Sequence, residues 1–232
     1  MKIKHGMILA AGLGKRMQPL TLKIPKPLLK IGKQNLLERA INLLIVNGVE
    51  EVTINIHHLG DQIKNFIKEK NYKINIIISD ETDHLLDTGG GILKGTRHLD
   101  YNDPFIVINP DTLWDKNYNQ ELKNLTQLYF KEKKPSMLLV NKDLSFDKSL
   151  SGDFSLNGYA ISKEEKNQFI YTGLQIINRK VFKEDTKIFS MNKIWNHLIT
   201  EKNLLGVEST QDFYHLNTFK MYEKISSQKS TD

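Results

Sequence analysis

The chain has 232 residues, 39% of them hydrophobic and none of them cysteine, so disulfides and thiolate metal sites are excluded, in agreement with a cytoplasmic location. Its mean hydropathy is −0.42 and no apolar stretch is long enough to span a bilayer, so we expect a soluble globular protein without membrane contacts. The formal charge of +6 would suit a nucleic-acid ligand, but most lysines are interleaved with acidic residues, so we expect no nucleic-acid partner.

Short apolar segments alternate with helical patterns along the chain. We predict strands at Gly6–Ala10, Val52–Ile56, Ile74–Ser79, Phe105–Asn109, Met137–Asn141 and Leu174–Asn178. We predict helices at Leu36–Val46, Asp61–Lys68, from about Thr88, at about Gln120–Phe130, at Lys193–Thr200 and at Phe219–Ser226. The helix at 36–46 has the clearest boundaries, because Asn35 is suited to cap it and Asn47-Gly48 to end it.

This alternation predicts an α/β protein with a Rossmann-like, mainly parallel sheet between two layers of helices. Residues 1–226 are expected to form a single domain and residues 227–232 a frayed tail. Turns at Gly152–Phe154 and Asn157–Tyr159 are expected to flank short strands. In such sheets ligands bind beyond the carboxyl ends of the strands, which directs attention to the loops that follow Ala10 and Asn109.

The loop after the first predicted strand is the most informative segment of the chain. Gly12 and Gly14 let the main chain approach a phosphate closely, where backbone N–H groups can donate to it. Arg16 and Lys26 supply two cations, and the prolines on both sides of Lys26 stiffen its backbone. The spacing matches neither a Walker loop nor the dinucleotide fingerprint. The two glycines and the two cations together predict a triphosphate-binding loop of another kind.

Residues 9–21 read Leu-Ala-Ala-Gly-x-Gly-x-Arg-Met-x-Pro-Leu-Thr and residues 25–28 read Pro-Lys-Pro-Leu. Together they resemble the signature of sugar-1-phosphate nucleotidyltransferases. The resemblance implies a GT-A type fold, with a mixed sheet. It also implies attack by a sugar-1-phosphate oxygen on the α-phosphorus of a nucleoside triphosphate, with release of pyrophosphate. Residues 55–62, 88–92 and 152–154 resemble the branch that activates N-acetylmuramate 1-phosphate with UTP.

The resemblance assigns roles to the residues of this loop. Arg16 would bind the β- and γ-phosphates, and Lys26 would bridge the α-phosphate and the incoming sugar phosphate. The backbone of the loop, with Asn109, would hold the base and ribose; the residues concerned are Ala10, Ala11, Gly12 and Gly14. Both reactants are polyanions, so positioning and charge neutralisation would supply most of the catalysis.

An acidic residue follows the strand predicted at Phe105–Asn109. Asp111 projects from that strand end into the expected ligand cleft, and Mg²⁺ prefers carboxylate oxygens combined with substrate phosphates. We predict that Asp111 is a Mg²⁺ ligand; the alternative is that it caps the following segment. Family members usually have Asn-Gly-Asp or Gly-Asp here, so Pro110 is a departure.

Three consecutive glycines open the helix predicted from about Thr88. They leave its N-terminal amides open to a ligand, and the resemblance implies that Gly89 and Gly90 face the nucleobase. The alternative is that the glycines permit tight packing of the helix. On the acceptor side, the resemblance implies that Asp153, Thr172 and Gly173 face the sugar. The alternative for the last two is the start of a strand with a bulge.

The second metal ligand of the family is an aspartate near the C-terminus, and here His215 stands in its place. Imidazole is a poor Mg²⁺ ligand. Three consequences are open: the metal relies on Asp111, phosphates and water; His215 selects Mn²⁺ or another ion; or activity is weakened or lost. Asp212, three residues earlier, is a carboxylate that could substitute if the loop is re-routed.

We expect a UTP-dependent enzyme that acts on N-acetylmuramate 1-phosphate and serves cell-wall sugar recycling, as a monomer or simple homodimer. One alternative is a guanylyl- or thymidylyltransferase for another hexose or heptose 1-phosphate. The other, suggested only by His215, is a catalytically weak nucleotide-binding subunit that regulates a partner.

Overall fold

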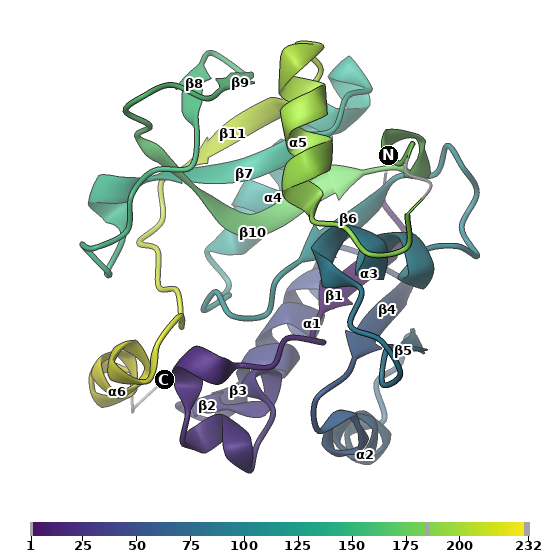
Figure 1. Cartoon of the computed structure of the whole chain (residues 1–232), viewed down its shortest axis with the longest axis vertical. Helices are drawn as coiled ribbons and strands as arrows, with labels where there is room; N and C mark the ends of the chain where they lie inside the picture. Colours follow the sequence, from purple (N-terminus) through teal and green to yellow (C-terminus); the bar gives the residue numbers. More distant parts are fainter. Residues whose placement is uncertain (1, 184–185, 230–232) are drawn as a thin grey trace.

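The computed structural model describes residues 2–183 and 186–229, which form a mixed sheet covered by helices on both faces (Figure 1). The strands are β1 (His5–Leu9), β2 (Lys30–Ile31), β3 (Gln34–Asn35), β4 (Glu51–Ile56), β5 (Asn75–Asp80), β6 (Phe105–Ile108), β7 (Ser136–Asn141), β8 (Ser155–Asn157), β9 (Ala160–Ser162), β10 (Phe169–Ile177) and β11 (Leu205–Ser209). The helices are α1 (Leu36–Val46), α2 (Gly60–Lys70), α3 (Asp87–Gly95), α4 (Tyr118–Glu132), α5 (Met191–Thr200) and α6 (Phe219–Gln228).

Nine strands among these residues form the main sheet, in the order β5-β4-β1-β6-β10-β7-β11-β9-β8, and β2 pairs with β3 separately. The first four are parallel, and the register of β1 with β6 pairs His5 with Phe105 and Ile8 with Ile108. The two strands therefore end at the same level. This arrangement brings the glycine loop after β1 beside the segment after β6 that carries Asp111.

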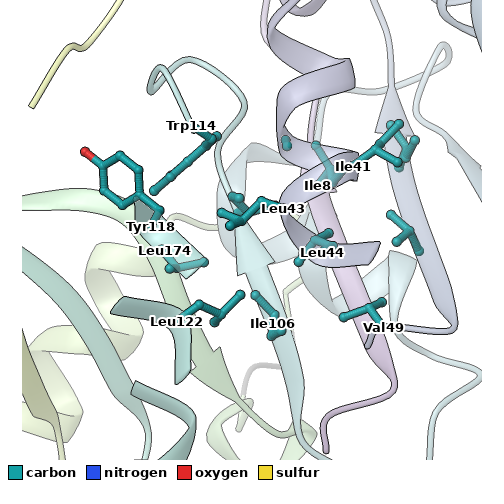
Figure 2. Packing of buried hydrophobic residues seen from close by; sticks show 14 of the residues in the cluster. Ile8, Ile41, Leu43, Leu44, Val49, Ile106, Trp114, Tyr118, Leu122 and Leu174 are labelled. Carbon is teal, nitrogen blue, oxygen red and sulfur yellow. The ribbon is translucent and has the colours of Figure 1, made fainter. Parts of the chain in front are cut away.

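The core lies on both faces of the sheet. On one face α1 and α4 bury Leu44 and Leu122 against Ile8 and Ile106 of the central strands, as Figure 2 shows. On the other face residues of α3 and α5 pack against Met7 and further residues of the same strands. Central strands covered on both sides read as continuous apolar runs, which is the pattern that predicted them. The predicted three-layer α/β architecture is confirmed.

Strand β10 runs antiparallel to both of its neighbours, β6 and β7, and divides the sheet. It begins at Phe169, ahead of the predicted strand at 174–178, and its pairing with β7 shifts register between Tyr171 and Gln175. Strand β11 was not predicted, because Gly206 and Glu208 interrupt its apolar pattern. It is held by parallel pairing with the buried strand β7 rather than by its own residues.

Helix α6 packs Met221 and Ile225 against Ile31 and Leu36, so the C-terminal segment lies beside the N-terminal loop region. It extends to Gln228, two residues into the tail predicted from 227, and residues 230–232 of that tail lie outside the described residues. No helix within the described ranges combines the length and the apolar character needed to cross a bilayer.

Helix α1 has the predicted boundaries, and the side chain of Asn35 accepts a hydrogen bond from the Glu38 amide at 2.7 Å. We expect Asn35→Ala to lower the free energy of unfolding by about 1 kcal/mol, because the first turn loses a partner for its amide. Thermal or urea unfolding measures the change. Asn65→Ala, at an exposed position within α2, is the control and should leave stability unchanged or slightly raised. Equal losses in both variants would contradict the capping role.

Candidate active site

The loop after β1 turns sharply at Gly14, which has φ +61°. Its carbonyl accepts hydrogen bonds from the Met17 amide and the Thr21 hydroxyl, each at 2.8 Å, and a Cβ at Gly14 would lie 2.8 Å from the Thr21 methyl group. Gly14 is therefore required by the fold. Gly12 differs, because a Cβ there would meet no atom within 4 Å. Its open side leaves room for a ligand.

A cavity of about 540 Å³ opens at the carboxyl ends of the parallel strands. Most of the predicted phosphate-handling residues line it: Ala10, Ala11, Gly12, Gly14, Arg16, Lys26, Asn109 and Asp111. Further lining residues come from beyond β4 and β5, among them Asn55, Glu81, Asp87 and Thr88. The predicted residues on the acceptor side, Asp153, Thr172 and Gly173, are not among those that line it, and neither are Gly89 and Gly90.

Lys26 and Asp111, 85 residues apart in the chain, meet in this cavity. The Lys26 Nζ lies 2.6 Å from Asp111 Oδ2, and His215 Nε2 lies 3.3 Å from the same oxygen. Burial by itself would raise the pKa of Asp111. The charges and hydrogen bonds of Lys26 and His215 outweigh burial and hold that pKa well below its usual range. Asp111 is therefore a carboxylate that contacts the ammonium of Lys26 and the imidazole of His215.

A buried polar chain fixes the end of β1. The Ala10 amide donates to Asn55 Oδ1 at 2.7 Å, and Asn55 Nδ2 donates to Glu81 Oε1 at 2.7 Å. The other oxygen of Glu81 accepts from the Leu86 amide at 3.1 Å, and Glu81 is only 1% exposed. Sequence reasoning missed Glu81. The signal was available, because Glu81 follows β5 much as Asp111 follows β6.

The family model described as nucleotidyl transferase matches residues 5–143, which include β1, the glycine loop, Lys26 and Asp111. The chain belongs to the nucleotidyl transferase family. The resemblance inferred from the loop and from the Pro-Lys-Pro frame is confirmed, and the protein is an enzyme of nucleotidyl transfer.

Two curated members of the family and one solved structure show how far the likeness extends. The N-acetylmuramate alpha-1-phosphate uridylyltransferase of Caulobacter vibrioides is 28% identical over 88% of each chain. The mannose-1-phosphate guanyltransferase of Hypocrea jecorina is 33% identical over the part that matches. That part covers 51% of this chain and 33% of the length of that enzyme. The UDP-glucose pyrophosphorylase from Acinetobacter baumanii superposes with a TM-score of 0.80 over 97% of this chain and 93% of that one. Its 14% identity makes that likeness one of fold alone.

The triple glycine serves packing in this nucleotidyltransferase. The amides of Gly89 and Gly90 donate to the Phe189 carbonyl at 2.9 and 3.1 Å. A Cβ on Gly89 would lie 2.3 Å from the Phe189 ring, and one on Gly90 would lie 2.1 Å from the Lys187 carbonyl oxygen. These contacts favour the alternative that the glycines permit tight packing, and contact of Gly89 and Gly90 with a nucleobase stays a prediction. The neighbouring Asp87 and Thr88 line the cavity instead.

On the acceptor side, the predicted contact of Thr172 with the sugar stays a prediction, and the structure shows a contact within the sheet. Its hydroxyl donates to the Leu138 carbonyl at 2.9 Å and the residue is 1% exposed, so it stabilises the sheet. Gly173 has φ +93° at the register shift of β10, which is the predicted alternative of a bulge, and a Cβ there would lie 2.8 Å from Asn109 Cβ. Asp153 is exposed, and its Oδ2 accepts from the Tyr171 amide at 2.9 Å.

The segment that carries His215 is anchored by α4. Glu121, 4% exposed, accepts from the Thr210 amide at 3.1 Å and from the side chains of Ser209, Thr210 and Gln211 at 3.3 Å. Downstream, His215 forms an antiparallel bridge with Thr112, directly after Asp111. Asp212 is exposed and does not line the cavity, so it does not replace the missing carboxylate.

The two kinds of glycine give a matched test. Gly12→Ala should leave the unfolding temperature unchanged but weaken nucleotide binding, because its Cβ enters the cavity. Gly90→Ala should lower stability by about 1–3 kcal/mol, because its Cβ overlaps the Lys187 carbonyl. Calorimetric unfolding and nucleotide titration measure both effects. A stable Gly90→Ala protein that had lost nucleotide affinity would restore the nucleobase role of that glycine.

Replacing Lys26 by alanine should lower the turnover number by about a hundredfold or more, because a cation aimed at the reacting phosphates is lost. Released pyrophosphate, measured with a coupled assay, reports the rate. Lys30→Ala, which removes an exposed lysine of β2, is the control and should retain activity. Full activity of the Lys26 variant would exclude that side chain from the reaction.

Proposed function

We propose that this enzyme transfers a uridylyl group from UTP to N-acetylmuramate 1-phosphate and releases pyrophosphate. The observation that carries the proposal is the convergence of the glycine loop, Lys26 and Asp111 on one cavity. The choice of UTP and of this sugar is supported by the likeness to the Caulobacter vibrioides enzyme, which extends over 88% of both chains. The proposal includes a cytoplasmic monomer or simple homodimer that serves cell-wall sugar recycling.

In the proposed reaction an oxygen of the sugar phosphate forms a bond to the α-phosphorus. The bond from that phosphorus to the oxygen bridging the β-phosphate breaks, and pyrophosphate leaves with the electron pair. Lys26 would bind the α-phosphate and the incoming phosphate, which holds the two polyanions in line. Arg16 lines the cavity and is exposed, so it is available to bind the β- and γ-phosphates.

The remaining ligand contacts are proposed from the lining of the cavity. The backbone of Ala10, Ala11, Gly12 and Gly14, with Asn109, would hold the base and ribose. A Cβ at position 91 would lie 2.8 Å from Asn55 Nδ2 and from Glu81 Oε1, so Gly91 leaves room for the hydrogen bond between these two lining side chains. Asp153 and Gly173 remain proposed contacts of the sugar, whereas the Thr172 hydroxyl is committed to the Leu138 carbonyl.

Asp111 fits a divalent cation, because a carboxylate combined with substrate phosphates is the donor set that Mg²⁺ favours. When bound, Mg²⁺ would neutralise phosphate charge. The described residues include no group of three or more His, Asp or Glu side chains that could hold a metal ion by themselves. The protein therefore supplies few donors, and Lys26 and His215 already contact the same oxygen of Asp111.

A second candidate, guanylyl transfer to a hexose 1-phosphate, is favoured by the 33% identity with the Hypocrea jecorina guanyltransferase. That match is confined to about half of this chain, which weakens it as a guide to the acceptor. The third reading is a catalytically weak nucleotide-binding subunit, which rests on the imidazole of His215 in contact with Asp111.

A substrate matrix tests the proposal. We expect UTP with N-acetylmuramate 1-phosphate to give the highest kcat/KM among UTP, GTP and dTTP paired with N-acetylmuramate, N-acetylglucosamine, mannose and glucose 1-phosphates. Pyrophosphate release and the mass of the nucleotide sugar provide the measurement. Preference for GTP with mannose 1-phosphate would favour the second candidate. A silent wild type that gains turnover on His215→Asp would favour the third.

A further inference from the structure

Asn217 lines the same cavity as Lys26 and Asp111. The residue is 6% exposed. The Leu216 amide donates to the Asp111 carbonyl at 2.8 Å and Thr112 bridges to His215, so this segment runs alongside the Asp111 segment. Packing of α6 against Ile31 and Leu36 holds the segment in place.

The side-chain amide of Asn217 is satisfied at one end only. Its Nδ2 donates to Asp147 Oδ2 at 3.0 Å, and this carboxylate partner identifies which end of the amide is the nitrogen. Its Oδ1 is buried and accepts no hydrogen bond. A buried carbonyl oxygen without a donor bears its full desolvation cost, and such oxygens are rare in folded proteins. The oxygen is therefore an unpartnered acceptor on a residue that lines the cavity.

The chemistry of the cavity limits what that partner can be. Phosphate oxygens are themselves acceptors, so Oδ1 of Asn217 requires a cation or a donor hydrogen. The ammonium of Lys26 is engaged with Asp111 at 2.6 Å. Glu81 also lines the cavity, but it is a poor candidate for a second metal ligand beside Asp111, because both of its oxygens already accept hydrogen bonds. It also follows β5, which lies on the other side of β1 from β6. Amide oxygen is a hard donor that suits divalent cations.

We propose that Asn217 Oδ1 is the second protein ligand of the divalent cation, beside Asp111. His215 then contacts Asp111 Oδ2 as a positioning residue, because it holds the carboxylate without needing to bind the ion. The inference rests on the proposed function only for the presence of a cation with a phosphate substrate. It assigns an oxygen ligand in a chain that has His215 at the position where the family has its second metal-binding aspartate.

Binding of Mn²⁺ in the presence of inorganic pyrophosphate tests this assignment, because that probe depends on neither the base nor the sugar. Electron paramagnetic resonance measures protein-bound Mn²⁺ for the wild type and three variants. Asn217→Ala should weaken Mn²⁺ binding about tenfold. Asn217→Asp, made together with Asp147→Asn so that position 217 still faces a hydrogen-bond donor, should tighten it. Asn119→Ala is the control, because the Asn119 carbonyl accepts from Asn47 outside the cavity, and it should bind Mn²⁺ as the wild type does.

A second measurement separates the cation from a sugar hydroxyl as the partner of Oδ1. The KM for the sugar 1-phosphate should be unchanged in Asn217→Ala at saturating Mn²⁺. A raised KM with unchanged Mn²⁺ affinity would overturn the assignment in favour of a sugar contact. If Asn217→Ala does not fold, the double variant Asn217→Asp with Asp147→Asn decides the question, and unchanged Mn²⁺ binding in that variant would overturn the proposal. Wild-type Mn²⁺ binding in a protein inactive with every tested substrate would count against the proposed function alone.

Discussion

The ion pair between Lys26 and Asp111 is the contact on which the rest of the site depends. It joins a stiff Pro-Lys-Pro segment to the end of a strand 85 residues away, and it forms because β1 and β6 are adjacent, parallel and in register. Partly buried charges are costly unless they are paired and hydrogen-bonded. The pairing therefore requires the central sheet, the loop turn at Gly14 and the segment after β6 to be formed together.

The electrostatic balance around this pair also defines the site. One carboxylate, Asp111, contacts both an ammonium and an imidazole, while Arg16 lines the same cavity. Lys26 and Arg16 therefore offset part of the negative charge that Glu81, Asp87 and Asp111 bring to a cavity for polyanions. The second anchor of the site is structural: Glu121 binds the segment that leads to His215, so α4 helps to determine where the imidazole lies.

Local sequence patterns predicted those parts of the molecule whose causes are local. Helix α1 was found with its boundaries because Asn35 and Asn47-Gly48 act within one turn of it. The direction of β10 and the existence of β11 were not found, since both depend on pairing with β7.

The same distinction holds within the site. The glycine loop, Lys26 and Asp111 have recognisable spacing, and they converge as predicted. The contact of Gly89 and Gly90 with the Phe189 carbonyl was not predicted, because that carbonyl lies about a hundred residues later in the chain. Glu81 and Asn217 carry no motif, and only their burial and hydrogen bonding distinguish them from ordinary polar residues.

The reversal of direction at β10 divides this enzyme into two modules. The four parallel strands on one side of it position the glycine loop and Asp111. The family match includes these strands and β7 on the other side, and it ends at residue 143, just after β7. The chain after residue 143 carries no motif as distinctive as the glycine loop with its Pro-Lys-Pro segment. Pairing with β7 holds β11, which belongs to this later part, in place. Changes in β8 to β11 therefore fall outside the segment that the family model matches. A chimera that exchanges the chain after residue 143 would replace β8 to β11 and leave the matched segment intact.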